Sequence, residues 1–181
     1  AKASLTSTLN KLAEKGKIAG AEEVLARLQF ATELSAFANC GLIIEAIIEN
    51  LDIKKKVFAD VEAVVSESCV LATNTSSLSV TSIAAACKKA DRVIGLHFFN
   101  PAPLMALVEI IPAVQTDAAL VDTCKEMIAV WGKAPVITKD TPGFIVNRVA
   151  RPYYAEAWRA LSQVRYQQQR LAEAEDAIET A

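Results

Sequence analysis

Short apolar runs and amphipathic helical segments alternate along most of the sequence. The apolar runs, rich in β-branched residues, stand at 41–46, 69–73, 92–96, 107–111 and 135–138. The helical segments between them span about 51–64, 80–88 and 117–131. Alternation of this kind predicts an α/β fold, in which helices cover a mostly parallel, Rossmann-like sheet.

The first of these helical segments shows the pattern in detail. Asn50 precedes it and is expected to cap its amino terminus. The apolar residues Ile53, Val57, Val61 and Val64 recur near helical spacing. These four side chains are therefore predicted to form the apolar face of the helix.

A Pro-Gly pair at 142–143 separates the sheet-forming part of the sequence from a long helical tail. We therefore place a domain boundary there. Residues 1–140 are expected to form the sheet domain, and residues 141–181 the start of an all-α carboxyl-terminal domain. Two helical stretches, one marked by leucines at 5, 9 and 12 and the other over 21–28, precede the first strand.

The composition excludes several functional classes. The chain is 52% hydrophobic and 22% charged, which is typical of a globular protein. Its net charge of -2 gives no basic surface to attract nucleic acids or anionic membranes. Its longest apolar stretch is interrupted at Glu45, so no membrane span is expected. The four cysteines are widely separated in the sequence, and the chain has a single histidine. This predicts reduced thiols in a cytoplasmic protein and no metal site.

His97 is the single histidine of the chain, and it stands where an apolar strand gives way to a proline-containing turn. The carboxyl ends of parallel strands line the ligand crevice of such sheets. Only imidazole, among unperturbed side chains, exchanges a proton near neutral pH. The alternative is a core histidine that is hydrogen-bonded to a backbone carbonyl.

Further polar residues are predicted to lie near His97. The segment 74–77, which includes Ser76, follows a strand and should reach the same sheet edge. Glu109 stands between Val108 and Ile110, where a carboxylate is costly to bury unless it is hydrogen-bonded, as it would be by an imidazole N–H. Glu109 and His97 would then form the orienting group and base of acid–base catalysis. The alternatives are an exposed edge carboxylate for Glu109 and a turn or helix-cap hydroxyl for Ser76.

With these motifs the chain resembles the NAD-dependent 3-hydroxyacyl-CoA dehydrogenases. The resemblance extends from near the start to about Leu161. The family's Glu-Ala-Ile-x-Glu-Asn-Leu motif stands at 45–51, Asn-Thr-Ser-Ser at 74–77, His-Phe-Phe-Asn-Pro at 97–101 and Asp-x-x-Gly-Phe-x-x-Asn-Arg-x-x-x-Pro at 140–152. The resemblance implies oxidation of (S)-3-hydroxyacyl-CoA to 3-ketoacyl-CoA with NAD, and a homodimer formed through the carboxyl-terminal helices.

The resemblance also implies roles for individual residues. His97 would be the catalytic base, held by Glu109. Ser76 and Asn147 would hydrogen-bond the oxygen that is oxidised. The residues expected along the nicotinamide and its ribose are Glu49, Lys54, Ser76 and Asn100. Lys15 and Thr8 would contact the CoA moiety.

A glycine-rich turn for the NAD diphosphate is absent from these 181 residues. From the resemblance, we expect these residues to correspond to the part of the family that follows its first βαβ stretch and includes only the start of its helical domain. We therefore expect an incomplete Rossmann-like sheet with a gap at its centre. These 181 residues alone would hold NAD weakly.

Two other functions remain open at this stage. The chain could be an acyl-CoA-binding or association module without turnover, which agrees with the missing glycine turn. Ser76, His97 and Glu109 could instead form a hydrolase triad, although Ser76 lacks the Gly-x-Ser-x-Gly turn that exposes such a nucleophile. The acyl chain length is not encoded in the reacting residues.

Overall fold

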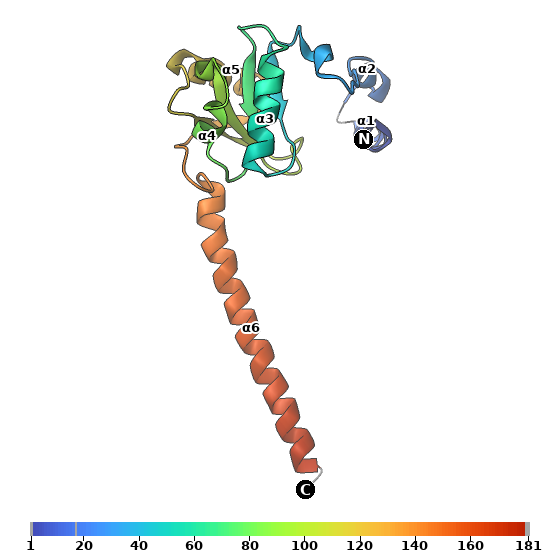
Figure 1. Ribbon diagram of the computed structural model, residues 1–181. Helices are drawn as coiled ribbons and strands as arrows, with labels where there is room; N and C mark the ends of the chain where they lie inside the picture. Colours follow the sequence, from blue (N-terminus) through green and yellow to red (C-terminus); the bar gives the residue numbers. More distant parts are fainter. Residues whose placement is uncertain (1, 17, 180–181) are drawn as a thin grey trace. The chain divides into compact units, whose positions relative to one another are not determined.

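A computed structural model describes residues 2–16 and 18–179 (Figure 1). The chain divides between Ala36 and Phe37 into two compact units, each described by itself. The first unit contains helices α1 (Lys2–Glu14) and α2 (Ala21–Ala26), and a 3-10 helix, η1 (Leu34–Phe37), spans the division. Helices α1 and α2 contact each other, and their residues Leu9 and Ala21 are buried. Two helical stretches therefore precede the first strand, as predicted.

The second unit is built on a five-stranded sheet. Its strands are β1 (Leu42–Glu45), β2 (Val70–Thr73), β3 (Val93–Phe98), β4 (Leu107–Pro112) and β5 (Ala134–Ile137). They lie side by side in sequence order. Strand β4 runs antiparallel to β3, and the other three pairings are parallel. The predicted mostly parallel Rossmann-like sheet is therefore confirmed, whereas the expected central gap is wrong, because the strands are contiguous.

Helices cover both faces of this sheet. Helices α3 (Leu51–Glu62) and α4 (Val80–Ala84) pack on one face, and α5 (Ala118–Val130) packs on the other (Figure 1). Alternate strand residues divide between two cores. Leu71 and Val93 join the core under α3 and α4, and Ala72 and Ile94 join the core under α5.

Helix α3 is capped as predicted, because the side chain of Asn50 accepts a hydrogen bond from the amide of Ile53 at 3.1 Å. Its buried face agrees with the prediction at Val61 and differs from it nearer the start of the helix. Ile53 is 42% exposed, whereas Lys54 and Phe58 are buried. The helix can turn a lysine inward because the Lys54 ammonium has a buried carboxylate partner, Glu45.

Helix α4 is shorter than the predicted segment 80–88. The amides of Lys88 and Lys89 donate to the carboxylate of Glu62 on α3, at 2.7 and 2.9 Å. They therefore do not continue the helical ladder. The short helix η2 (Ala90–Arg92) then leads into β3.

The last helix of the second unit is α6 (Val146–Glu179), 34 residues long. Every side chain over 151–173 is exposed. Its large exposed apolar residues include Tyr153, Trp158 and Leu161. The helical tail is therefore confirmed, and the division into domains 1–140 and 141–181 stays a prediction.

Gly95 allows α4 to approach β3 closely. A Cβ atom added at residue 95 would lie 2.9 Å from Val80 Cγ2 and 2.9 Å from Ile111 Cβ, closer than carbon atoms pack. Gly95→Ala is therefore expected to lower the free energy of unfolding by about 1–3 kcal/mol in denaturant titrations. Gly41→Ala is the matched control, because a Cβ there meets nothing within 4 Å. Equal stability of the two variants would contradict the close packing.

Candidate active site

The His97–Glu109 pair lies at the carboxyl ends of the parallel strands. His97 on β3 is directly opposite Glu109 on β4 in the antiparallel register. The imidazole Nδ1 lies 2.7 Å from Glu109 Oε2, and the two residues are only 5% and 1% exposed. With Glu109 as a carboxylate, Nδ1 carries the hydrogen and Nε2 is left as a proton acceptor. The histidine is therefore bonded to a carboxylate, and not to a backbone carbonyl.

The second oxygen of Glu109 binds the start of α6. The backbone amides of Ile145 and Val146 each donate to Oε1 at 2.9 Å. A carboxylate at a helix amino terminus is stabilised by the unpaired N–H groups and by the helix dipole. Glu109 is thus hydrogen-bonded on both oxygens, which explains how it can be buried.

Two aromatic rings flank the imidazole. The ring of Phe99 lies 4.5 Å from that of His97, and the ring of Phe144 lies 5.6 Å away, centroid to centroid. Phe144 is 2% exposed and has a φ angle of 49°, in the left-handed region that side chains rarely adopt. Strain of this kind is retained where surrounding contacts hold the residue. The imidazole is consequently confined on two sides.

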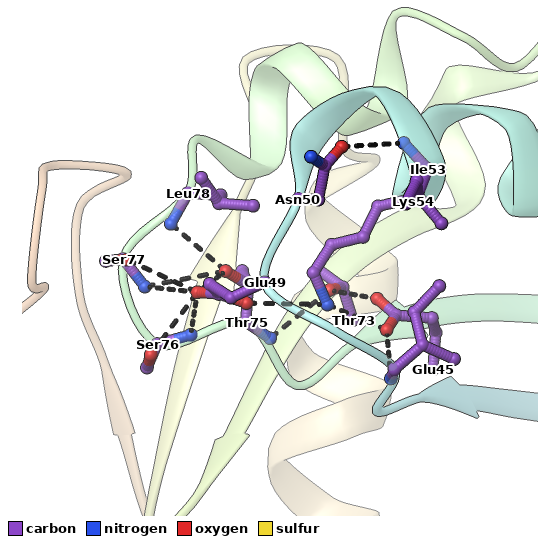
Figure 2. A network of polar contacts seen from close by, with 11 residues as sticks. Glu45, Glu49, Asn50, Ile53, Lys54, Thr73, Thr75, Ser76, Ser77 and Leu78 are labelled. Carbon is purple, nitrogen blue, oxygen red and sulfur yellow. Dashed lines mark hydrogen bonds and ion pairs between the residues drawn. The ribbon is translucent and has the colours of Figure 1, made fainter.

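The loop after β2 folds around the carboxylate of Glu49, as Figure 2 shows. Glu49 Oε1 accepts hydrogen bonds from the Thr75 hydroxyl at 2.6 Å, the Ser76 amide at 2.9 Å and the Ser77 amide at 3.1 Å. The Ser76 hydroxyl also lies 3.3 Å from this oxygen. Two expected site residues, Glu49 and Ser76, are therefore brought together.

These hydrogen bonds determine the charge of Glu49. Burial by itself raises the pKa of this carboxyl group, but the bonds from Thr75 and Ser76, together with the positive charge of Lys54, lower it to about 2. Glu49 is therefore fully ionised at neutral pH.

Two asparagines connect the loop at 74–77, which we call the Ser76 loop, to the His97–Glu109 pair. Asn147, in the first turn of α6, donates from Nδ2 to the backbone oxygen of Ser76 at 3.2 Å. Asn74 accepts a hydrogen bond from the amide of Phe98 at 2.7 Å. The amide nitrogen of Asn147 carries a second hydrogen, which this bond leaves available. Segments far apart in sequence thus form one site.

Lys54 is buried and does not lie on the surface. Its ammonium lies 2.7 Å from Glu45 Oε1 and 3.5 Å from Glu49 Oε2, and the residue is 1% exposed (Figure 2). It is adjacent to Glu49, as expected of neighbours in the site. Its enclosure, however, leaves little surface for direct contact with a ligand.

Asp140 had no role assigned from the sequence, and it binds the start of α4. Its carboxylate accepts from the amides of Val80 and Thr81, at 2.9 and 2.8 Å, and from the Ser79 hydroxyl at 2.9 Å. It therefore holds the start of α4 against the segment that leads to Phe144. Its position within the motif at 140–152 was the available signal, as it was for Phe144.

The remaining expected residues are less defined. Asn100 is exposed, two residues after the end of β3. Lys15 and Thr8 lie in the first unit, where Thr8 is in the middle of α1 and Lys15 directly follows the last residue of that helix. Their contact with CoA stays a prediction.

Other chemistries have no support in the described residues. The part of the chain that the structure describes contains no cluster of three metal-binding side chains. None of its described helices is long and apolar enough to cross a bilayer. Burial raises the pKa of the Cys124 thiol to about 11, and burial with the nearby charge of Glu62 does the same for Cys87, so neither is a reactive thiolate at neutral pH.

A mostly parallel sheet with helices on both faces, and polar residues near the carboxyl ends of its strands, is typical of nucleotide-binding α/β domains. Comparison with known families gives the same class. The family described as 3-hydroxyacyl-CoA dehydrogenase, NAD binding domain, matches residues 1–141. The chain belongs to this family.

Known relatives extend beyond the matched region. The chain is 50% identical to 3-hydroxyadipyl-CoA dehydrogenase of Escherichia coli over 157 residues, which cover 86% of this chain and 33% of that protein. It is 43% identical to 3-hydroxybutyryl-CoA dehydrogenase of Clostridioides difficile over 155 residues, 84% of this chain and 55% of that one. The chain thus spans between a third and somewhat over half of these relatives.

Solved structures agree in fold. The crystal structure of (S)-3-hydroxybutyryl-CoA dehydrogenase from Ralstonia eutropha superposes with a TM-score of 0.84 at 39% identity, over 89% of this chain and 58% of that chain. That of 3-hydroxybutyryl-CoA dehydrogenase from Escherichia coli also gives 0.84, at 48% identity, over 88% and 34%. The arrangement of the strands is therefore that of this family.

The lowered pKa of Glu49 predicts a pH dependence of stability. Its folded-state pKa of about 2 lies below the ordinary 4.5, so the unfolded chain binds more protons in this range. The stabilisation is present above pH 4.5 and is lost as the pH falls towards 2. Urea titrations of the wild type and Glu49→Gln should therefore differ most near neutral pH and converge between pH 4.5 and 2. A difference independent of pH in this window would contradict the bonding of Glu49.

Proposed function

We propose that the protein interconverts (S)-3-hydroxyacyl-CoA and 3-ketoacyl-CoA with NAD, using His97 as general base and acid. The observation that carries this proposal is the buried His97–Glu109 bond of 2.7 Å, set between the Ser76 loop and the start of α6. Membership of the family supports the reaction class.

The geometry supports a simple division of roles. Glu109 holds Nδ1, so Nε2 of His97 accepts the proton of the 3-hydroxyl while the hydride leaves C3. Bound NAD supplies the hydride acceptor. The second amide hydrogen of Asn147 stabilises the developing carbonyl oxygen, and the Ser76 hydroxyl does so after rotating away from Glu49, to which it donates in this structure. In the reverse direction, the imidazolium returns the proton to that oxygen.

The residues present fit the nicotinamide end of NAD. The Glu49 side chain is 36% exposed, so its Oε2 can accept hydrogen bonds from the ribose hydroxyls. The exposed side-chain amide of Asn100 offers one hydrogen-bond donor group and one acceptor. Lys54 contributes indirectly, through its ion pair with the Glu49 carboxylate. The sequence has no glycine-rich turn for the diphosphate, so these residues account for one end of the cofactor only.

The same proposal includes the setting of the enzyme. Residues 1–140 form the nucleotide-binding domain, and residues 141–181 begin a helical domain through which two copies associate as a homodimer. The exposed apolar side chains of α6 support that association. Lys15 and Thr8 bind the CoA moiety, and the protein acts in the cytoplasm on acyl-CoA, with no nucleic-acid or membrane partner.

A hydrolase triad is less well supported. A serine nucleophile needs a hydrogen bond to its base. In the described part of the chain, the Ser76 hydroxyl bonds to Glu49 and makes no hydrogen bond to His97. Labelling of Ser76 by a fluorophosphonate would favour this alternative.

Replacing His97 by glutamine should remove the proton acceptor. In the complete natural polypeptide that contains these residues, His97→Gln is expected to lower kcat for reduction of acetoacetyl-CoA by about a hundredfold to ten-thousandfold. NADH absorbance measures the rate, and longer 3-ketoacyl-CoAs give the chain-length preference. Glu126→Gln, exposed on α5, is the control. Full activity in His97→Gln would refute the assignment.

The 181-residue chain by itself is expected to bind NADH weakly, because a glycine-rich turn is lacking. Titration followed by nicotinamide fluorescence measures this. Weak NADH binding together with retained acyl-CoA binding would agree with the acyl-CoA-binding alternative for the isolated chain. Tight, stoichiometric NADH binding would contradict the need for further residues.

A further inference from the structure

Glu45 stands where two loops of the site meet. It ends β1, it is 6% exposed, and its backbone oxygen accepts from the Asn74 amide at 2.7 Å. Its carboxylate Oε1 also accepts from the amide of Ile47 at 2.6 Å. The first contact fixes the start of the Ser76 loop, and the second fixes the turn that leads to Glu49. One residue therefore contacts both loops that carry the proposed binding residues.

The carboxylate of Glu45 also holds the cation beside Glu49. Lys54 Nζ lies 2.7 Å from Glu45 Oε1 but 3.5 Å from Glu49 Oε2 (Figure 2). The shorter contact is with the more buried carboxylate, so Glu45 determines where the ammonium sits. Glu49 then has its Oε1 in the Ser76 loop and its Oε2 facing a fixed positive charge.

A second series of bonds runs from Glu45 to the Ser76 loop. The Thr73 hydroxyl donates to Glu45 Oε2 at 2.8 Å and accepts from the Thr75 amide at 3.2 Å. Thr75 in turn donates its hydroxyl to Glu49 at 2.6 Å. Thr73 and Thr75 are 0% and 1% exposed, so water does not compete for these bonds. Glu45 is thus connected to Glu49 by two routes, one through the ammonium of Lys54 and one through the hydroxyls of the two threonines.

We propose that Glu45 is a positioning residue, which sets the orientation of the Glu49 carboxylate and the Ser76 loop without itself touching a ligand. The kinetic part of this proposal rests on the proposed function, because it assigns Glu49 and Ser76 to the cofactor and the reacting oxygen.

The consequence of removing the Glu45 charge follows from electrostatics. In Glu45→Gln the buried ammonium of Lys54 keeps only Glu49 as an anionic partner, and an unpaired buried charge is strongly unfavourable. Lys54 therefore draws the Glu49 carboxylate towards itself and away from the Ser76 and Ser77 amides. The cofactor contact is displaced although no contacting residue has changed.

The kinetic test uses the complete natural polypeptide that contains these residues. Glu45→Gln should raise the KM for NADH by about tenfold to a hundredfold, the scale of a misplacement of roughly 1 Å, with a smaller effect on kcat. In a Glu49→Gln background the same change should raise this KM no further, because the effect passes through Glu49. Thr73→Val, which keeps both charges, should change KM in the same direction and by less. Additive effects in the double variant, or an unchanged KM in Glu45→Gln, would overturn the proposal.

Glu62→Gln is the matched control. Glu62 also binds a cation, Arg92, and two backbone amides, but these lie in and just before η2 and not in the site. Its loss should lower the thermal midpoint while leaving the KM for NADH unchanged. A purely structural role for Glu45 predicts the same result for Glu45→Gln.

A spectroscopic readout separates this proposal from the proposed function. With serine labelled by 15N, the amide signals of Ser76 and Ser77 report their bonds to Glu49 and need no substrate or turnover. Both signals should shift in Glu45→Gln and stay in place in Glu62→Gln. If the wild type shows no NADH-dependent activity, the proposed function fails while the shifts still test the positioning. Unshifted signals in folded Glu45→Gln would overturn it.

Discussion

The site depends on one buried carboxylate that is shared between a ring and a helix. Glu109 receives the imidazole of His97 on one oxygen and the first amides of α6 on the other. Neither contact would fix the histidine alone, because a single hydrogen bond allows the carboxylate to rotate. With both oxygens occupied at 1% exposure, the plane of the carboxylate is determined, and the tautomer of His97 with it. The chemistry of β3 is therefore coupled to the placement of α6.

The same arrangement recurs at two other places in the second unit. Glu49 accepts hydrogen bonds from backbone amides of the loop after β2, and Asp140 accepts them from the first amides of α4. In each case a carboxylate satisfies backbone N–H groups that begin a turn or helix, and so joins segments distant in sequence. The strands supply the common edge, and these carboxylates determine where each loop lies along it.

The sequence predicted the contact between His97 and Glu109, but not the contacts that support this pair. The His97–Glu109 pair could be inferred because a carboxylate inside an apolar strand needs a donor, and one imidazole was available. The antiparallel direction of β4 was not evident, because an apolar run has no direction of its own. The resemblance placed Lys54 along the cofactor, and the helical periodicity gave no sign of its burial, since only apolar residues are counted as buried there. The partner that makes its burial tolerable, Glu45, lies nine residues away on another element.

The position of Gly95 explains how these parts reach one another. It lies two residues before His97, on the same face of β3, and its missing side chain lets α4 approach the sheet. That approach places the start of α4 where Asp140 can bind it, and Asp140 is four residues before Phe144, whose ring packs against His97. A shift of one residue between β3 and β4 would move Glu109 to the opposite face, away from both His97 and α6. Register and close packing therefore come first, and the hydrogen bonds of the site follow from them.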